Sequence, residues 1–414
     1  MAAFRRRYVP AAVVVLGAAA LGFSTRSSAA AGTTVSALKP ISRPALQRVI
    51  DATAREMLIP GAVVLLRTPQ GNFTIAHGTA QLGTSIAPSA GTYFRIASNT
   101  KTMTAAIVLQ LAQEGKLKLD DPVSKYVAHV PDGDGITIAE LLEMRSGLYN
   151  YTDSPTIAQI IDRNPATVWT PEELLTIAFA HPANFAPGTS YEYCNTNYAL
   201  LGLIIERLDG KPLAQAMHDR LFGPLGLRHT MLPPSGVTTL PKPFARGYLY
   251  GSSSVALYGE PPYSPEFKAS AQAGTVLPTD YTGVNPSFAA AAGGVISNAD
   301  DLATWITALV TGRVLDAAYQ RLWLDSLRPE DPGKRNSQRY GYGIAELRWG
   351  SNVIYYHGGE TAGYNSFMGY DPANHVTLVV WTNLTVSLDQ VPTANALMLK
   401  VLDQIYAVSP LSQR

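Results

Sequence analysis

Strand-like segments occur near both ends of this 414-residue sequence, and the long stretch between them has a mainly helical pattern. Residues 61–67 and 72–77 are apolar runs on either side of the turn sequence TPQG, which is typical of an antiparallel strand pair. Four more strands are predicted near the other end, at residues 341–347, 352–357, 364–370 and 376–383. Helices are predicted at residues 44–58, over most of 99–235, at 298–308 and at 391–406.

The simplest assembly of these segments is one antiparallel sheet with strands from both chain ends. We therefore predict an α/β (α+β) fold in which the terminal helices flank the sheet and a mainly helical subdomain, about residues 99–235, is inserted. Residues 43–407 form a single domain in this interpretation. The stretch 240–290 is rich in Tyr, Gly, Ser and Pro and has no long periodic segment, so we expect a loop that borders a cleft.

Two helix boundaries have clear local signals. Thr170 and Glu173 match a capping box with Pro171 at the first helical position, which predicts a helix beginning there. A second helical pattern begins at Asn197 and ends before Gly210, a residue suited to the left-handed conformation that terminates helices.

The N-terminus has the pattern of an export signal. Residues 5–7 are all arginine, an apolar run follows over residues 8–23, and small residues fill 27–31. The run is shorter than the roughly 20 residues that span a bilayer, so we expect a cleaved signal peptide over residues 1–31 and no stable membrane span after cleavage. Residues 32–42 are predicted to be a linker. The mature protein is expected to be secreted or in the cell envelope, and the choice between general and twin-arginine export stays open.

Composition excludes several classes of protein. Charged residues make up 15% and hydrophobic residues 46% of the chain, which indicates a substantial buried core. No basic run follows the N-terminal arginines, so nucleic-acid binding is not expected. Cys194 is the only cysteine, which excludes a disulfide framework and a thiolate metal cluster. We interpret it as a small buried residue rather than a nucleophile.

Most common catalytic motifs are missing from the sequence. The G-x-S-x-G nucleophile elbow, the H-E-x-x-H metal motif, the P-loop and G-x-G-x-x-G do not occur. A serine–lysine pair remains, Ser98-x-x-Lys101, at the start of a run that is apolar nearly all round and therefore predicts a buried helix. A second S-x-x-K at residues 36–39 lies in the predicted linker with no such helix behind it.

Residues three apart on a helix share a face, so Ser98 and Lys101 are expected to meet. Burial disfavours the charge of a lysine and lowers its pKa, which allows Lys101 to take the proton of the serine hydroxyl. The alternative is an ordinary helix cap followed by an exposed lysine.

Two further clusters favour the catalytic interpretation. Tyr193-x-Asn195 precedes a predicted helix, and His357-x-Gly359 lies at the end of a predicted strand. With S-x-x-K, these motifs and their order resemble the class C β-lactamase and D-alanyl-D-alanine carboxypeptidase branch of the serine β-lactamase and penicillin-binding family. The resemblance spans roughly residues 43–407 and implies a β-lactamase/transpeptidase-like fold. A packing role for Tyr193 and a strand-end turn at His357 stay open as the alternatives.

The resemblance implies a role for each motif residue. Ser98 is implied to be the acylated nucleophile, with Lys101 and Tyr193 sharing the proton transfers and Tyr193 stabilised toward phenolate by a nearby ammonium. Asn195 is implied to orient Lys101 and the substrate amide. His357 stands where the β-lactamases have a lysine and is expected to form a hydrogen bond toward Tyr193.

The implied oxyanion hole consists of the backbone N–H groups of Ser98 and Glu360, next to Gly359. A backbone donor places no demand on the Glu360 side chain. Gly358 occupies the position of a threonine that grips the substrate carboxylate in carboxypeptidases, and Thr361 is the candidate substitute. For Arg339 and Arg348 the alternatives are a carboxylate-binding role and a solvated surface position.

We therefore expect an exported serine hydrolase that works through a Ser98 acyl-enzyme, foremost a D-alanyl-D-alanine carboxypeptidase on peptidoglycan stem peptides. A β-lactamase or carboxylic-ester hydrolase on the same machinery is the first alternative. A non-catalytic cell-wall binding or sensing protein is the alternative from another class. The mechanism requires no cofactor and no metal, and none is expected.

Overall fold

The computed structural model describes residues 38–259, 261–334 and 337–407. The predicted signal peptide and linker residues 32–37 lie outside these described residues. In the described part, no helix is both long enough and apolar enough to cross a bilayer.

An eight-stranded antiparallel sheet forms the centre of the molecule, in the order β2-β1-β12-β11-β10-β9-β8-β7. The N-terminal pair β1 and β2 joins the C-terminal strands through β12, with Ala62 opposite Thr382. The predicted sheet with strands from both chain ends is therefore confirmed. Its strands are β1 (Gly61–Thr68), β2 (Gly71–Gly78), β7 (Arg328–Pro329), β8 (Arg339–Tyr340), β9 (Ala345–Trp349), β10 (Asn352–Thr361), β11 (Tyr364–Asp371) and β12 (Val376–Thr382).

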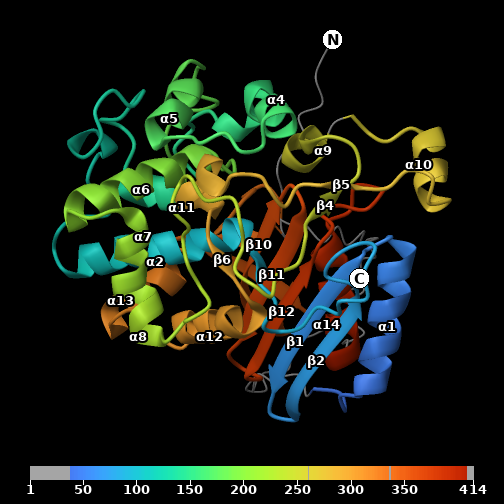
Figure 1. The fold of residues 1–414 in the computed structure, drawn as a ribbon. Coiled ribbons are helices and arrows are strands. Elements are labelled where there is room, and N and C mark those ends of the chain that lie inside the picture. The colour runs from blue at the N-terminus through green and yellow to red at the C-terminus, as the bar shows by residue number, and fades with distance from the viewer. Residues whose placement is uncertain (1–37, 260, 335–336, 408–414) are drawn as a thin grey trace, which may run out of the picture.

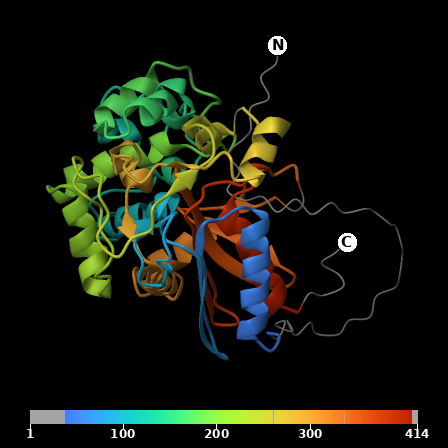
Figure 2. The ribbon, with the colours of Figure 1, turned by 45° about the vertical axis from the view of Figure 1, so that its right-hand side comes forward.

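Helices cover both faces of this sheet (Figures 1 and 2). The terminal helices α1 (Arg43–Glu56) and α14 (Thr393–Ile405) pack against each other and against one face, as predicted. On the other face lie α12 (Ala299–Val310) and the short 3₁₀ turn η1 (Ala97–Asn99), which leads into α2 (Thr100–Gln113). Because both faces are covered, every residue of β11 and β12 is buried, which explains the mainly apolar sequence of β12.

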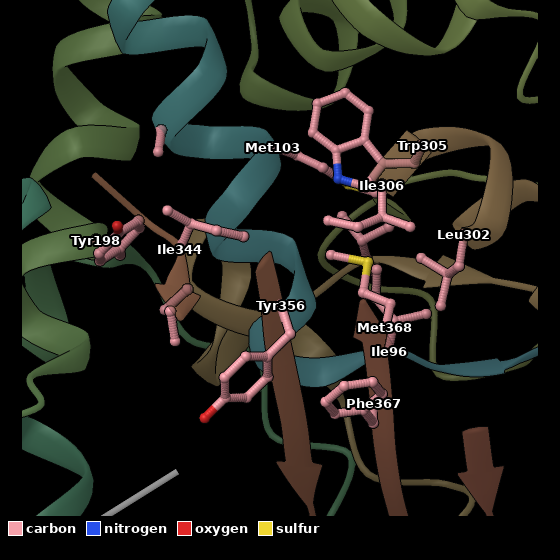
Figure 3. Packing of buried hydrophobic residues seen from close by; sticks show 14 of the residues in the cluster. Ile96, Met103, Tyr198, Leu302, Trp305, Ile306, Ile344, Tyr356, Phe367 and Met368 are labelled. Carbon is pink, nitrogen blue, oxygen red and sulfur yellow. The ribbon is translucent and has the colours of Figure 1, made fainter. Parts of the chain in front are cut away.

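The core between α2, α12 and the sheet is shown in Figure 3. Met103 of α2 and Trp305 of α12 are fully buried there, and Met368 of β11 lies beneath them. The indole N–H of Trp305 donates to Thr102 Oγ1 at 2.8 Å, so its one polar atom is satisfied. This packing fixes the start of α2 against the central strands.

Every named element within residues 99–235 is helical or part of a helical turn. The predicted capping box at Thr170 is present, and the predicted helix end at Gly210 has φ 65°. The α-helices of this region after α2 are α3 (Ile138–Leu142), α4 (Pro155–Arg163), α5 (Pro171–Phe179), α6 (Asn195–Asp209), α7 (Leu213–Met217) and α8 (Gly223–Leu225).

Several short elements differ from the sequence prediction. The strand expected from residue 341 begins at Ala345, because Gly343 turns with φ 69°. A Cβ on Gly343 would lie 2.6 Å from that of Ala105, so this turn packs closely on α2. Elements not predicted are the sheet strands β7 and β8, and also β3 (Phe94–Arg95), β4 (Tyr248–Leu249), α9 (Ser253–Tyr258), α10 (Pro265–Gln272), β5 (Thr279–Asp280), α11 (Ala290–Gly293), β6 (Ile296–Ser297) and α13 (Ala317–Asp325).

Candidate active site

Ser98 lies in η1, directly before α2, on a strained turn. The preceding Ala97 has φ 47°, a left-handed conformation that is unfavourable for a residue with a side chain. Gly359 of β10 packs against this turn, where a Cβ would lie 2.1 Å from the carbonyl oxygen of Ile96. The turn and the strand therefore hold Ser98 beside the end of β10.

Lys101 and Ser98 meet as the sequence predicts. The Lys101 Nζ lies 3.1 Å from Ser98 Oγ, and the lysine side chain is completely buried. The same Nζ is 2.6 Å from Asn195 Oδ1 and 2.7 Å from the carbonyl oxygen of Ala292. Burial holds the pKa of Lys101 well below its usual range. Because burial disfavours its charged form, this nitrogen is suited to accept the Ser98 hydroxyl proton.

Asn195 begins α6 and is fixed from two sides. Its Nδ2 donates to Thr152 Oγ1 at 3.0 Å, and its backbone N–H donates to Asn150 Oδ1 at 2.9 Å. With Oδ1 on Lys101, the amide is oriented as the resemblance implies. The sequence prediction missed Thr152 and Asn150, which carry no recognisable pattern and are recognised only by their contacts.

Tyr193 lies beside the pair, with Lys101 Nζ 4.7 Å from the centre of its ring. Burial raises the pKa of Tyr193 well above its usual range, although a hydrogen bond with the Ser98 side chain works in the opposite direction. Because burial raises this pKa, the expected stabilisation toward phenolate is not found in the free enzyme. Tyr193 is a neutral phenol and a proton donor.

His357 faces a residue that the sequence prediction missed. Its Nδ1 lies 2.6 Å from the carbonyl oxygen of Gly358, and its Nε2 lies 3.0 Å from the hydroxyl of Tyr340. A carbonyl only accepts, so Nδ1 carries the hydrogen and Nε2 accepts from Tyr340. The expected hydrogen bond toward Tyr193 is thus replaced by one to Tyr340, and the rings of Tyr193 and His357 lie 6.4 Å apart.

Burial, together with nearby Lys101, lowers the pKa of His357 to about 3. Between about pH 6.5 and 3 the unfolded chain binds a proton at this histidine and the folded chain does not, so stability falls as the pH falls, by up to about 1.4 kcal/mol per pH unit. We expect His357→Asn to show a shallower fall of Tm from pH 6.5 to 4 than the wild type. His218→Asn, at a histidine with 68% side-chain exposure, is the control and should follow the wild type. Equal slopes in all three proteins would contradict a neutral buried His357.

Ser98 opens into a cavity of about 30 Å³. Ala97 and Ser98 form one wall, and Glu360 and Thr361 at the end of β10 form another. Leu257 of α9 also lines it, so residues 240–290 contribute to this cavity. The remaining lining residues are Tyr151, Thr152, Asn195, Phe288, Ala289, Ala292 and Gly293. The two backbone groups of the implied oxyanion hole, at Ser98 and Glu360, thus belong to residues that line one cavity.

The other candidate residues lie away from this chemistry. Cys194 is buried, donates from Sγ to the carbonyl oxygen of Leu148 at 3.3 Å, and burial raises its pKa to about 12, which fits a packing role. Arg339 and Arg348 both pair with Glu346 and do not line the cavity. The described residues contain no group of three or more His, Cys, Asp or Glu side chains that could hold a metal ion.

Proteins of known structure share this arrangement of elements. The D-stereospecific amidohydrolase from a Streptomyces species superposes with a TM-score of 0.72 at 29% identity, over 86% of this chain and 98% of that one. The D-amino acid amidase from Ochrobactrum anthropi, solved with D-phenylalanine, gives a TM-score of 0.73 at 27% identity, over 87% and 98% of the two chains.

Protein flp of Staphylococcus aureus (strain MW2) is 26% identical over 355 residues. These cover 83% of this chain and only 63% of that protein's length. The family described as Beta-lactamase matches residues 46–403, which is most of the described chain. Lys101 and Tyr193 lie beside Ser98, and the family match shows that the chain belongs to the β-lactamase family of serine hydrolases.

Proposed function

We propose that this serine hydrolase cleaves amide bonds of small D-configured amino-acid derivatives through an acyl-enzyme on Ser98. The observation that carries the proposal is the fully buried Lys101, whose Nζ lies 3.1 Å from Ser98 Oγ. The D-configuration is supported by the two structural neighbours, a D-stereospecific amidohydrolase and a D-amino acid amidase. An intact set of proton-transfer groups argues against a non-catalytic binding protein, which has no chemical need for a neutral lysine beside a serine.

The proton transfers follow from the protonation states. Lys101 accepts the Ser98 hydroxyl proton as Oγ bonds to the substrate carbonyl carbon, and the backbone N–H groups of Ser98 and Glu360 receive the oxyanion. Tyr193 donates its proton to the leaving nitrogen as the C–N bond breaks, and the Lys101 ammonium then reprotonates Tyr193. In deacylation Lys101 takes a proton from water as the water oxygen bonds to the acyl carbon. The bond from this carbon to Ser98 Oγ then breaks, the proton returns to Oγ, and the carboxylic acid is released.

The expected D-alanyl-D-alanine carboxypeptidase stays a second candidate. Thr361 lines the cavity, and its hydroxyl can donate a hydrogen bond to a substrate carboxylate, which Gly358 cannot do. However, no Arg, Lys or His is among the described residues that line the cavity, so a substrate carboxylate has no cationic partner there. β-Lactams and esters are substrates for the same acylation machinery.

Intact-mass measurement after incubation with benzylpenicillin tests the acyl-enzyme. We expect a penicilloyl adduct, or hydrolysed drug, with the wild type and neither with Ser98→Ala. Ammonia release from D-alaninamide and L-alaninamide then tests the substrate class, with the D-isomer preferred. Equal modification or turnover by Ser98→Ala would refute the nucleophile.

We also propose that the protein is exported. The support is the pattern of arginines, apolar residues and small residues over residues 1–31. Mass analysis of the N-terminus of the protein recovered from culture medium or cell envelope tests this, with cleavage near Ala31 as the expected result.

A further inference from the structure

We propose that the side chain of Glu360 forms an ammonium subsite, so that the enzyme prefers substrates with a free, positively charged amino group on the carbon next to the scissile carbonyl. This inference rests on the proposed Ser98 acyl-enzyme and names its preferred substrate class. The family resemblance assigns Glu360 only a backbone role.

Glu360 lies next to the implied oxyanion hole. It is the second-last residue of strand β10, three residues after His357, and it lines the same cavity as Ser98. Its backbone N–H is the implied oxyanion donor, and its own Cα is only about 1.5 Å from that nitrogen. The substrate carbonyl is bound at this N–H, and its α-carbon is one bond from the carbonyl carbon. A substituent on the α-carbon therefore lies within reach of the Glu360 side chain.

The charge of the cavity favours a cation. Glu360 carries the only acidic or basic side chain among the described residues that line it; the polar ones are the neutral Ser98, Tyr151, Thr152, Asn195 and Thr361. Lys101 does not line this cavity, and burial disfavours its charged form. A small cavity with a single negative charge attracts an ammonium and repels a carboxylate.

The carboxylate is also oriented by its neighbour across the sheet. Asn365 lies opposite Glu360 in β11, and its Nδ2 is 3.3 Å from Glu360 Oε2. Asn365 Oδ1 in turn accepts from the backbone N–H of Ala394 at 2.8 Å, so the amide orientation is fixed. The acidic group is therefore held by the framework of the sheet.

Two substrates of similar shape separate the effect of the substrate's positive charge from that of its size. D-alaninamide carries an ammonium and D-lactamide a hydroxyl at the same carbon, with the same leaving group. We expect wild-type kcat/KM to favour D-alaninamide at least tenfold. This ratio should fall about tenfold or more in Glu360→Gln and stay at the wild-type value in Glu172→Gln, which removes the same charge from an exposed position of α5.

A pH profile separates charge recognition from a structural effect of the substitution. The α-amino group of the substrate loses its proton at roughly pH 8, so the preference for D-alaninamide should decline above that pH in the wild type and not in Glu360→Gln. Equal wild-type rates on the two amides, or a Glu360→Gln ratio equal to the wild type, would overturn the ammonium subsite. Benzylpenicillin acylation without turnover of D-alaninamide would overturn it as well. Absence of both acylation and turnover would instead refute the proposed function on which it rests.

Discussion

Replacing Lys101 with methionine is expected to lower kcat/KM for amide hydrolysis by about 10³- to 10⁴-fold. Methionine is of similar length and keeps the buried volume filled, but it has no lone pair that accepts the Ser98 proton. The pH profile of the wild type should support the same role. Because burial lowers the pKa of Lys101, the base stays unprotonated to a lower pH than an exposed lysine would, and activity should fall as acid protonates it.

Lys118→Met is the matched control, since Lys118 is exposed after the end of α2. It should keep wild-type kinetics. Circular dichroism and thermal unfolding of Lys101→Met establish that the fold persists. A Lys101→Met rate within tenfold of the wild type, in a folded protein, would contradict the assignment of Lys101 as the base.

Replacing Gly359 with alanine is expected to lower kcat/KM about 100-fold or more and to destabilise the protein by about 1–3 kcal/mol. A Cβ at this position would lie 2.1 Å from the carbonyl oxygen of Ile96 and 2.6 Å from Ser366 Oγ. The first of these atoms is backbone and cannot rotate away. The strand and the nucleophile turn must therefore separate, which displaces Ser98 from the end of β10.

The neighbouring glycine is the control for this substitution. A Cβ on Gly358 would meet its nearest atom, the carbonyl oxygen of Ser366, at 3.6 Å, which is ordinary contact. Gly358→Ala should therefore keep most of the stability and the acylation rate. Similar losses in both variants would show that the close approach of β10 to η1 is not what requires glycine at 359. Denaturant unfolding and benzylpenicillin acylation rates measure the two effects separately.

The parts of the site that were predictable are those encoded by local pattern. Ser98 and Lys101 are three residues apart at the start of a helix, so their contact follows from helical geometry. Tyr340 could not be found in this way, because it lies 17 residues before His357 and contacts it only through strand pairing across β8, β9 and β10. The protonation of Tyr193 depends on its complete burial, which no short motif specifies.

The elements of the fold also divide into those predictable from local pattern and those that depend on tertiary contact. Long periodic segments such as α12 and α14 were predicted close to their observed ends. The first predicted C-terminal strand began four residues too early, because the turn at Gly343 is imposed by contact with α2. Short helices such as α9 and α11 depend on tertiary packing, since a few residues cannot nucleate a helix alone.

The sheet described above also determines when this enzyme becomes active during its synthesis. β1 pairs with β12, in which Thr382 lies 320 residues after its partner Ala62. Until the intervening chain has been made, residues 63–66, which are buried in the finished sheet, expose their apolar side chains and an open hydrogen-bonding edge to water. During that interval the chain is prone to aggregation and has no complete active site. The edge of β1 is covered and the active site is completed at the same stage, when β10, which carries His357, and the later strand β12 join the sheet.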